Sequence, residues 1–178
     1  MSGLASDDIT PWLPPDELAL VRSKVPMIYV DIVPVRVDAV GLVEQVGLLL
    51  RNPREGGILR SLVSGRVLYR ERVREAIVRH LEKDLGLLCL PQLPVAPQPF
   101  TIAEYFPTPG AGFHDPRQHA VSLGYVIPVD GECEPQQDAL DLTWFTPAEA
   151  TDPALLAEMV DGHDVLLRQA MAHVGRLW

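Results

Sequence analysis

The stretch from residue 65 to residue 87 constrains the fold more than any other part of this chain. Between residues 71 and 85 it contains neither glycine nor proline, the two residues that most disfavour a helix. Apolar residues recur there at every fourth position, namely at Val73, Ile77, Leu81 and Leu85. This spacing places them on one face of an α-helix, and Gly86 follows where a left-handed residue can end that helix. The sequence therefore predicts an amphipathic helix over residues 71–85 that packs on a sheet.

Segments with the composition of β-strands lie on both sides of this helix. They are rich in β-branched residues and are separated by turn-forming residues. These segments are residues 25–37, 47–51, 58–63, 100–106, 119–129 and 142–145. Residues 153–173 are predicted to form a terminal helix with His163 and His173 on its surface. The order of elements predicts an α+β fold in which a mixed β-sheet is flanked by helices.

The first 24 residues differ in character from the rest of the chain. Residues 1–15 are polar and contain prolines, which is typical of an extended arm. Residues 16–22 begin with acidic residues and have apolar spacing, so they predict a short helix. Trp12 and Leu13 give this arm apolar side chains that can contact a partner subunit. We therefore expect an N-terminal arm over residues 1–24 and one domain over residues 25–178.

Length and charge limit the classes of partner. A chain of 178 residues is long enough for one domain with a sizeable core. The formal net charge of −9 argues against nucleic acid and against anionic membranes as partners. No apolar segment approaches the length of a membrane span, and the N-terminus does not resemble a signal peptide. We expect a cytoplasmic protein in which Cys89 and Cys133 are structural thiols without a disulfide.

Residues 65–87 resemble the Nudix box, whose pattern is G-x5-E-x7-R-E-U-x-E-E-x-G-U with U a bulky apolar residue. The matching residues are Gly65, Glu71, Arg79, Leu81, Gly86 and Leu87. The resemblance implies the Nudix α/β/α sandwich, in which this loop and helix hold a divalent metal against a diphosphate. Here His80 and Lys83 replace glutamates, and Asp84 is a shorter acid. A lysine and a histidine beside one aspartate form a poorer oxygen cage for Mg2+ than paired carboxylates do.

The order of segments outside the box is similar to the GDP-mannose mannosyl hydrolase branch of the Nudix superfamily. The similarity covers about residues 12–173 and includes residues 21–23, Pro26, Asp31, residues 49–51, residues 65–67, His119, residues 123–125 and Trp144. It implies that water attacks a nucleotide sugar at the sugar carbon and that the nucleoside diphosphate leaves. It also implies Mg2+ or Mn2+ as cofactor, and a homodimer formed through exchanged N-terminal arms.

The resemblance implies a metal site with three ligands. They are the backbone carbonyl of Ser64 and the side chains of Asp84 and Asp138. The choice of Asp138 assumes a register without a gap, which places Ala139 where the family has its general base. Since alanine cannot accept a proton, the base would be His114 or would be missing. In a register shifted by one residue, Gln137 would bind the metal and Asp138 would be the base.

The resemblance also implies residues that act on the substrate. The implied catalytic residues are Arg51, Arg66, Arg79 and His119, and the implied substrate-binding residues are Asp31, Arg51 and Arg66. Guanidinium groups suit a leaving diphosphate because they donate two parallel hydrogen bonds. Asp31 also stands out without the resemblance, because a carboxylate among β-branched residues needs a partner.

Several of these residues also have a structural interpretation. Arg79 has Glu75 one helical turn before it, which permits an ion pair along the helix. Asp84 can be solvated at the helix end, and His80 is interpreted as a hydrogen-bonded structural residue. His119 opens an apolar strand, so a structural role is as well founded as a contact to substrate.

Two functions remain open from the sequence. In the first, the protein is a metal-assisted hydrolase of a nucleoside diphosphate derivative, with a nucleotide sugar as the expected substrate. In the second, the same pocket binds a nucleotide or sugar without turnover, as expected when the helix acids and the general base are missing. Both give a nucleoside diphosphate-linked small molecule as the partner.

Overall fold

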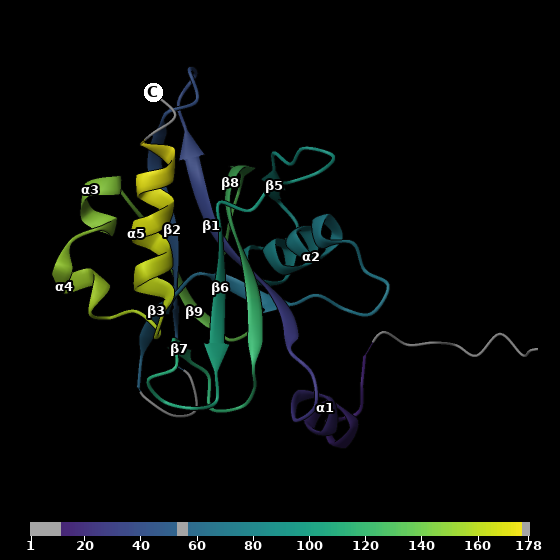
Figure 1. Ribbon diagram of the computed structural model, residues 1–178. Helices are drawn as coiled ribbons and strands as arrows, with labels where there is room; N and C mark the ends of the chain where they lie inside the picture. The colour runs from purple at the N-terminus through teal and green to yellow at the C-terminus, as the bar shows by residue number, and fades with distance from the viewer. Residues whose placement is uncertain (1–11, 53–56, 176–178) are drawn as a thin grey trace, which may run out of the picture.

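The computed structural model describes residues 12–52 and 57–175 (Figure 1). Its strands are β1 (Met27–Val37), β2 (Val43–Arg51), β3 (Leu59–Ser61), β4 (Val63–Arg66), β5 (Cys89–Pro91), β6 (Thr101–Phe106), β7 (Phe113–His114), β8 (Ala120–Gly131) and β9 (Ala139–Phe145). Its helices are α1 (Pro15–Arg22), α2 (Val73–Leu85), α3 (Pro147–Ala150), α4 (Pro153–Leu156) and α5 (His163–Val174). Residues 1–11 of the predicted arm lie outside the described residues, and α1 is its predicted short helix.

The strands form a mixed sheet, as the sequence predicts. Its main path runs in the order β3-β2-β1-β8-β6-β7, while β4 pairs with β1, β5 with β8 and β9 with β2. The central pair, β1 and β8, is parallel, whereas β1 is antiparallel to β2 and to β4. This arrangement brings the strand that precedes the box loop beside the centre of the sheet.

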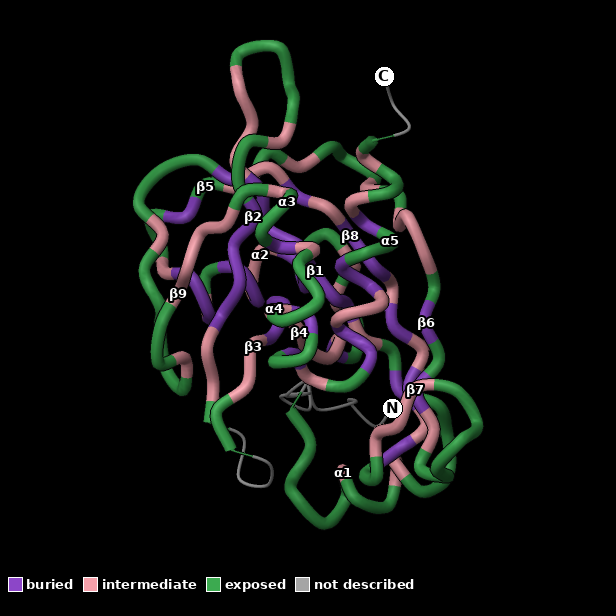
Figure 2. The backbone as a smooth tube through the Cα atoms, turned by 90° about the vertical axis from the view of Figure 1, so that its left-hand side faces the viewer, coloured by how far each residue is buried: buried purple, intermediate pink, exposed green. Residues whose placement is uncertain are grey.

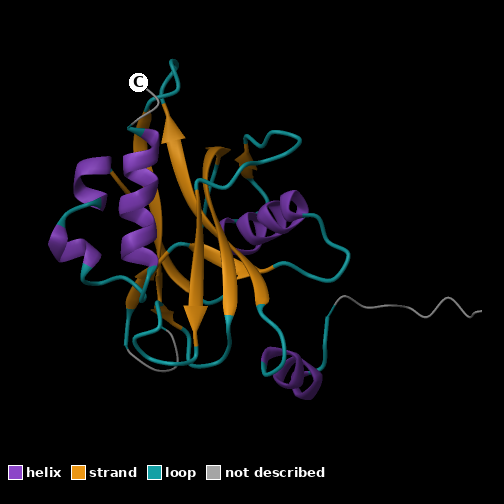
Figure 3. Cartoon of the chain, viewed as in Figure 1, coloured by secondary structure: helices purple, strands orange, loops and turns teal. Residues whose placement is uncertain are grey.

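Helices cover both faces of the sheet, with α2 on one face and α5 on the other (Figure 3). Because residues of a strand alternate between faces, β1 buries Val30 and Ile32 on the α2 side and Val33 on the α5 side. The predicted apolar stripe of α2 is confirmed, since Ile77, Leu81 and Leu85 are fully buried. Each such side chain contributes about 1.5–3 kcal/mol of burial free energy. Figure 2 shows this buried interior along β1, β2 and β8.

The ends of the box helix agree closely with the prediction. Helix α2 begins at Val73, two residues later than predicted, because Glu71 still belongs to a turn in which its backbone N–H donates to the carbonyl of Leu68 (3.1 Å). It ends at Leu85, and Gly86 has a φ of +86°, a backbone conformation that favours glycine.

The prediction of a single terminal helix over residues 153–173 is wrong, because the structure has two separate helices there, α4 and α5. The chain leaves the helix after α4 because residues 158–160 pair with β3, where the backbone of Arg60 donates to the carbonyl of Glu158 (2.8 Å) and accepts from Val160 (2.9 Å). Gly162 then adopts a φ of +82° before α5 begins. None of the described helices has both the length and the hydropathy of a membrane span.

Candidate functional site

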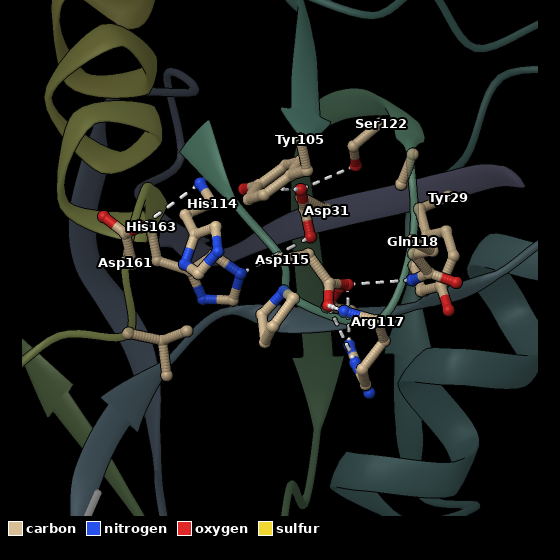
Figure 4. Close-up of a pocket in the computed structure, with 14 residues that line it drawn as sticks. Tyr29, Asp31, Tyr105, His114, Asp115, Arg117, Gln118, Ser122, Asp161 and His163 are labelled. Atoms are coloured by element: carbon tan, nitrogen blue, oxygen red, sulfur yellow. Dashed lines mark hydrogen bonds and ion pairs between the residues drawn. The ribbon is translucent and has the colours of Figure 1, made fainter. Parts of the chain in front are cut away.

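A pocket of about 300 Å³ opens on the α5 face of the sheet (Figure 4). It lies between β1, β6, β8 and the segment before α5, and its lining includes Tyr29, Asp31, Ser64, Tyr105, residues 114–118, Ser122, Asp161 and His163. Asp31 reaches this pocket because it alternates with Val30 and Ile32, which face α2. The register also sets Asp31 opposite Ser64 on β4. We call this cavity the Asp31 pocket.

Asp31 is a buried carboxylate, only 3% exposed, that accepts hydrogen bonds from two hydroxyl groups. Ser122 donates from Oγ at 2.6 Å and Tyr105 donates from its hydroxyl at 3.4 Å, both to Oδ2. Burial raises the pKa of Tyr105 far above its ordinary value, and the carboxylate acts in the same direction, so the hydroxyl remains a donor. The prediction that Asp31 needs a partner is therefore confirmed.

His163 lies on the other side of the Asp31 carboxylate, with its Nε2 atom 3.6 Å from Oδ1. The backbone N–H of Leu62 donates to Nδ1 of His163 at 3.1 Å. Since Nδ1 accepts, the ring proton is on Nε2, which faces Asp31. Burial lowers the pKa of His163, although Asp31 acts against this change. The ring is therefore neutral, with its Nε2 proton facing Asp31 at a distance too long for a hydrogen bond, and neither nitrogen is available as a general base.

The segment before β8 forms a rigid wall of the pocket. Arg117 donates from Nε and Nη2 to the two carboxylate oxygens of Asp115 (2.9 Å each), and Gln118 donates from Nε2 to Asp115 (2.9 Å). Burial opposes ionisation of Asp115, but the bonds from Arg117 outweigh it and lower the pKa of this carboxyl. The backbone N–H of His114 donates to Asp161 (3.2 Å), which ties the segment to the approach of α5.

The residues predicted to bind metal include Asp84 and Asp138, and Arg51 lies between them. The Nη2 atom of Arg51 is 2.7 Å from Oδ2 of Asp84, Nζ of Lys83 is 3.1 Å from Oδ1, and Nη1 of Arg51 pairs with Asp138. The Asp84 side chain is 0% exposed, whereas that of Asp138 is 76% exposed. Within the described chain, neither oxygen of Asp84 has an aligned hydrogen-bond donor, so the pairing is mainly electrostatic.

This arrangement does not fit a divalent metal ion. Asp84 already has two cationic groups close to its oxygens, and a metal there would be repelled by both. The third implied ligand is the backbone carbonyl of Ser64, a residue that also lines the Asp31 pocket. Over residues 12–52 and 57–175, no group of three or more His, Cys, Asp or Glu side chains could hold a metal ion. Cys89 is buried, Cys133 is partly buried, and both thiols are free.

Arg79 on α2 connects the box loop to the helix by an ion pair and hydrogen bonds. It forms a two-point ion pair with Glu71, from Nε to Oε1 (2.6 Å) and from Nη2 to Oε2 (2.8 Å), and Nη2 also donates to the carbonyl of Arg66 (2.8 Å). The bond from Arg79 is the largest cause of the lowered pKa of Glu71. The alternative pair with Glu75 does not form, because Glu75 accepts from the backbone N–H of Arg72 at the start of α2. The donors of Arg79 are thus largely committed to the protein itself.

His80 explains the glycine that opens the box. Its ring lies directly on Gly65, where an added Cβ would come within 1.8 Å of Cε1. Its Nε2 atom is 3.0 Å from the carbonyl of Arg66, and burial lowers the pKa of the imidazole. This geometry agrees with the interpretation of His80 as a hydrogen-bonded structural residue.

The other implied substrate residues lie apart from this cluster. Arg66 pairs with Tyr29 across β4 and β1, and its Nη1 atom is buried without a hydrogen-bond partner in the described part of the chain. His119 stacks on Phe106 with ring centroids 4.6 Å apart, and its carbonyl accepts from the N–H of Met27 (2.9 Å). The fold therefore groups Arg51, Asp84 and Asp138 together and places Asp31 with Ser64.

Sequence reasoning missed the contribution of α5 to the pocket. The prediction that His163 lies on the helix surface is wrong, whereas His173 is exposed as predicted. The missed signal was spacing, because His163 shares one helical face with the buried residues Leu166, Leu167 and Ala170. Tyr105 gave no comparable signal, since its role depends on a partner from another strand.

Comparison with known proteins identifies the family. A family described as a domain of unknown function (DUF4916) matches residues 8–176. A solved structure from Jonesia denitrificans, described as a possible asymmetric diadenosine tetraphosphate (Ap4A) hydrolase, is 62% identical to this chain. It covers 87% of this chain and 98% of its own, with a TM-score of 0.83. No curated protein matches.

More distant structures share the fold alone. A MutT NUDIX hydrolase from Burkholderia pseudomallei is 17% identical, covers 82% of this chain and 98% of its own, and has a TM-score of 0.59. The NUDIX domain of Shewanella oneidensis NrtR, solved with ADP ribose, is 17% identical, covers 91% of this chain and 94% of its own, and has a TM-score of 0.59. The chain therefore belongs to the DUF4916 family, and its fold is that of the Nudix hydrolases.

Proposed function

We propose that this protein binds a nucleoside diphosphate derivative, with a nucleotide sugar as the first candidate, and that binding requires no metal ion at the box. The observation that carries this choice is the pairing of the buried Asp84 with Arg51 and Lys83. These two side chains supply the positive charge that a metal would otherwise supply. A binding function then needs no metal ion at Asp84, whereas metal-assisted hydrolysis does.

The chemistry of the Asp31 pocket supports a sugar as the bound group. A volume of about 300 Å³ is at the lower end of ligand pockets and suits one ring rather than a whole dinucleotide. Sugar hydroxyls both donate and accept hydrogen bonds. Asp31 offers an acceptor, Tyr29 and Tyr105 offer hydroxyl groups with apolar ring faces, and Asp161 offers a second carboxylate near the opening.

Hydrolysis of a nucleoside diphosphate derivative is the second candidate function. It is favoured by the 62% identical protein from Jonesia denitrificans, which is described as a possible Ap4A hydrolase. In this case Arg51 would have to leave Asp84 when a ligand binds. The second candidate thus requires a rearrangement that the first does not.

A panel of ligands separates the two candidates. GDP-mannose, ADP-ribose and Ap4A are each added to the full-length protein with Mg2+, with Mn2+ and with EDTA. Binding is measured by calorimetry, and turnover by release of phosphate after phosphatase treatment and of reducing sugar. We expect binding of a nucleotide sugar with equal affinity in all three conditions and no product. Metal-dependent product formation would support the hydrolase, and absence of binding by all three ligands would contradict both functions.

We also propose that the protein forms a homodimer through its N-terminal arm. Leu20 on α1 is 60% exposed, and Leu13, two residues before α1, is 36% exposed. The ring of Trp12 lies over the guanidinium of Arg79 in the same chain, with 5.5 Å from Cζ to the ring centroid. The contact between subunits would therefore come from the two leucines. Light scattering should show a dimer at micromolar concentration, and a Leu20→Glu variant should be monomeric; a monomeric wild type contradicts this assembly.

A further inference from the structure

We propose that a second pocket, next to the Asp31 pocket, binds the phosphoryl group of the ligand. This basic pocket has a volume of about 420 Å³ and lies between residues 22–26 at the end of α1, Pro107 after β6, and residues 117–119 before β8. Its charged or titratable side chains are Arg22, Lys24, Arg117 and His119, and no acidic residue lines it. In a chain with a net charge of −9, such a concentration of positive charge suits an anionic ligand.

Arg22 and Lys24 have no acidic partner in the part of the chain that the structure describes. The ion pairs within residues 12–52 and 57–175 include neither side chain. The Nε atom of Arg22 is buried and has no hydrogen-bond partner among these residues. A buried guanidinium N–H without an acceptor is unfavourable, so an acceptor from a ligand would be stabilising. By contrast, Arg51 at the box already pairs with two carboxylates.

The end of α1 does not compete for these cations. Its last carbonyl groups accept from the backbone N–H groups of Ser23, Lys24 and Val25, at 3.0–3.2 Å. The hydroxyl of Ser23 also donates to the carbonyl of Leu20 (2.7 Å). The backbone carbonyls at this helix end therefore do not need the side-chain donors of Arg22 and Lys24, which both line the basic pocket.

The opposite wall of the basic pocket is fixed in position. Asp115 holds Nε and Nη2 of Arg117, which leaves Nη1 without a partner there, and also offsets part of its charge. His119 is held by its stacking on Phe106, and its Nε2 atom is buried without a hydrogen-bond partner in the described segments. The pocket thus offers the cations of Arg22 and Lys24 together with nitrogen atoms of two further side chains. This set matches the charge and the several oxygens of a phosphoryl group better than it matches a carboxylate.

The two pockets are adjacent, because Arg117 and Gln118 line both of them. A ligand with its phosphate in the basic pocket can place its uncharged part beside Asp31. The assignment of the uncharged part as a sugar rests on the proposed function. The phosphoryl site itself does not. The shared chemistry is a phosphate group, which can belong to inorganic phosphate, to a diphosphate or to a nucleotide.

The test measures binding of inorganic phosphate, pyrophosphate and GDP-mannose to the full-length protein by calorimetry at constant ionic strength. The variants are Arg22→Gln and Lys24→Gln, with Arg22→Lys to retain the charge. Arg168→Gln is the matched control, because it also removes one arginine from a helix and its only ion-pair partner in the described chain is Asp164 on α5. We expect each glutamine variant to weaken pyrophosphate binding at least about tenfold, the loss typical of a charged hydrogen bond, while Arg168→Gln does not change it.

The outcomes separate this inference from the proposed function. Pyrophosphate binding that depends on Arg22, without binding of GDP-mannose, supports the basic pocket and contradicts the nucleotide sugar. GDP-mannose binding that is equal in wild type and both glutamine variants overturns the basic pocket and leaves the proposed function intact. Pyrophosphate binding that is equal in wild type and both glutamine variants, or no binding of any phosphate to wild type, also overturns it.

Discussion

Replacing Arg51 by glutamine should strongly destabilise the protein, because Asp84 would keep its charge without its closest partner. Asp84 is 0% exposed, and Arg51 lies 2.7 Å from its carboxylate. Removal of one partner from a buried ion pair costs about 3–5 kcal/mol. Lys83 remains at 3.1 Å from the other oxygen, so we expect the lower end of that range, about 3 kcal/mol.

Asp138→Asn is the matched control, because it breaks the other ion pair of the same guanidinium. The Asp138 side chain is 76% exposed, and such a pair contributes about 0–1 kcal/mol. The free energy of unfolding is measured for both variants by urea denaturation at pH 7. A double variant, Arg51→Gln with Asp84→Asn, should recover part of the loss because the buried side chain at position 84 is then neutral. Equal stability of Arg51→Gln and Asp138→Asn would refute the view that Arg51 compensates the buried charge of Asp84.

Three further substitutions test other parts of the structure. Lys83→Glu removes one cation beside Asp84 and should raise Mg2+ affinity in the ligand-free protein; calorimetry showing no gain over wild type contradicts the role given to Lys83. The pKa of His163 is lowered below its ordinary value of 6.5, so as pH falls the unfolded chain binds the proton before the folded protein does, and the free energy of unfolding should decrease below about pH 6.5. In a plot of the urea midpoint against pH, His163→Phe should flatten this decrease. An unchanged slope in the variant would contradict the assignment of the decrease to His163. Gly65→Ala should cost about 1–3 kcal/mol because the new methyl group meets the His80 ring, and it should cost clearly less in a His80→Ala background; equal costs in both backgrounds would mean that the ring is not the obstacle.

The parts of the fold that follow from local sequence were predictable. The stripe of α2 and the glycine after it depend on residues close in the chain, and so does the β-branched composition of β1. The break between α4 and α5 was not predictable in this way. It arises because Arg60, about a hundred residues earlier, takes the backbone hydrogen bonds that a continuous helix would need. Local propensity contains no information about such a distant competitor.

The same distinction between local sequence and distant partners applies to the residues of the candidate site. The need of Asp31 for a partner followed from its apolar neighbours, yet its actual partners come from β6, β8 and α5. Arg51 was identified as a phosphate ligand from a resemblance, but its nearest acids are Asp84 and Asp138. A sequence shows which residues carry charge. The packing of β2 against α2 and β9 in the folded chain is needed to show which acidic side chain each basic side chain meets.

The acid at position 84 has a structural reason that does not involve a metal. If Arg51 on β2 is removed, Asp84 on α2 becomes a buried carboxylate without its closest partner. Lys83 adds positive charge to the same carboxylate, and His80 fills the space over Gly65 with a neutral ring. The other half of the box, Glu71 with Arg79, keeps the loop attached to the helix without contacting this cluster. A chain can therefore retain the shape of the box while its charge balance is met by its own side chains. A phosphate ligand would then depend on cations without an acidic partner among the described residues, and Arg22 and Lys24 are two of these that line one pocket.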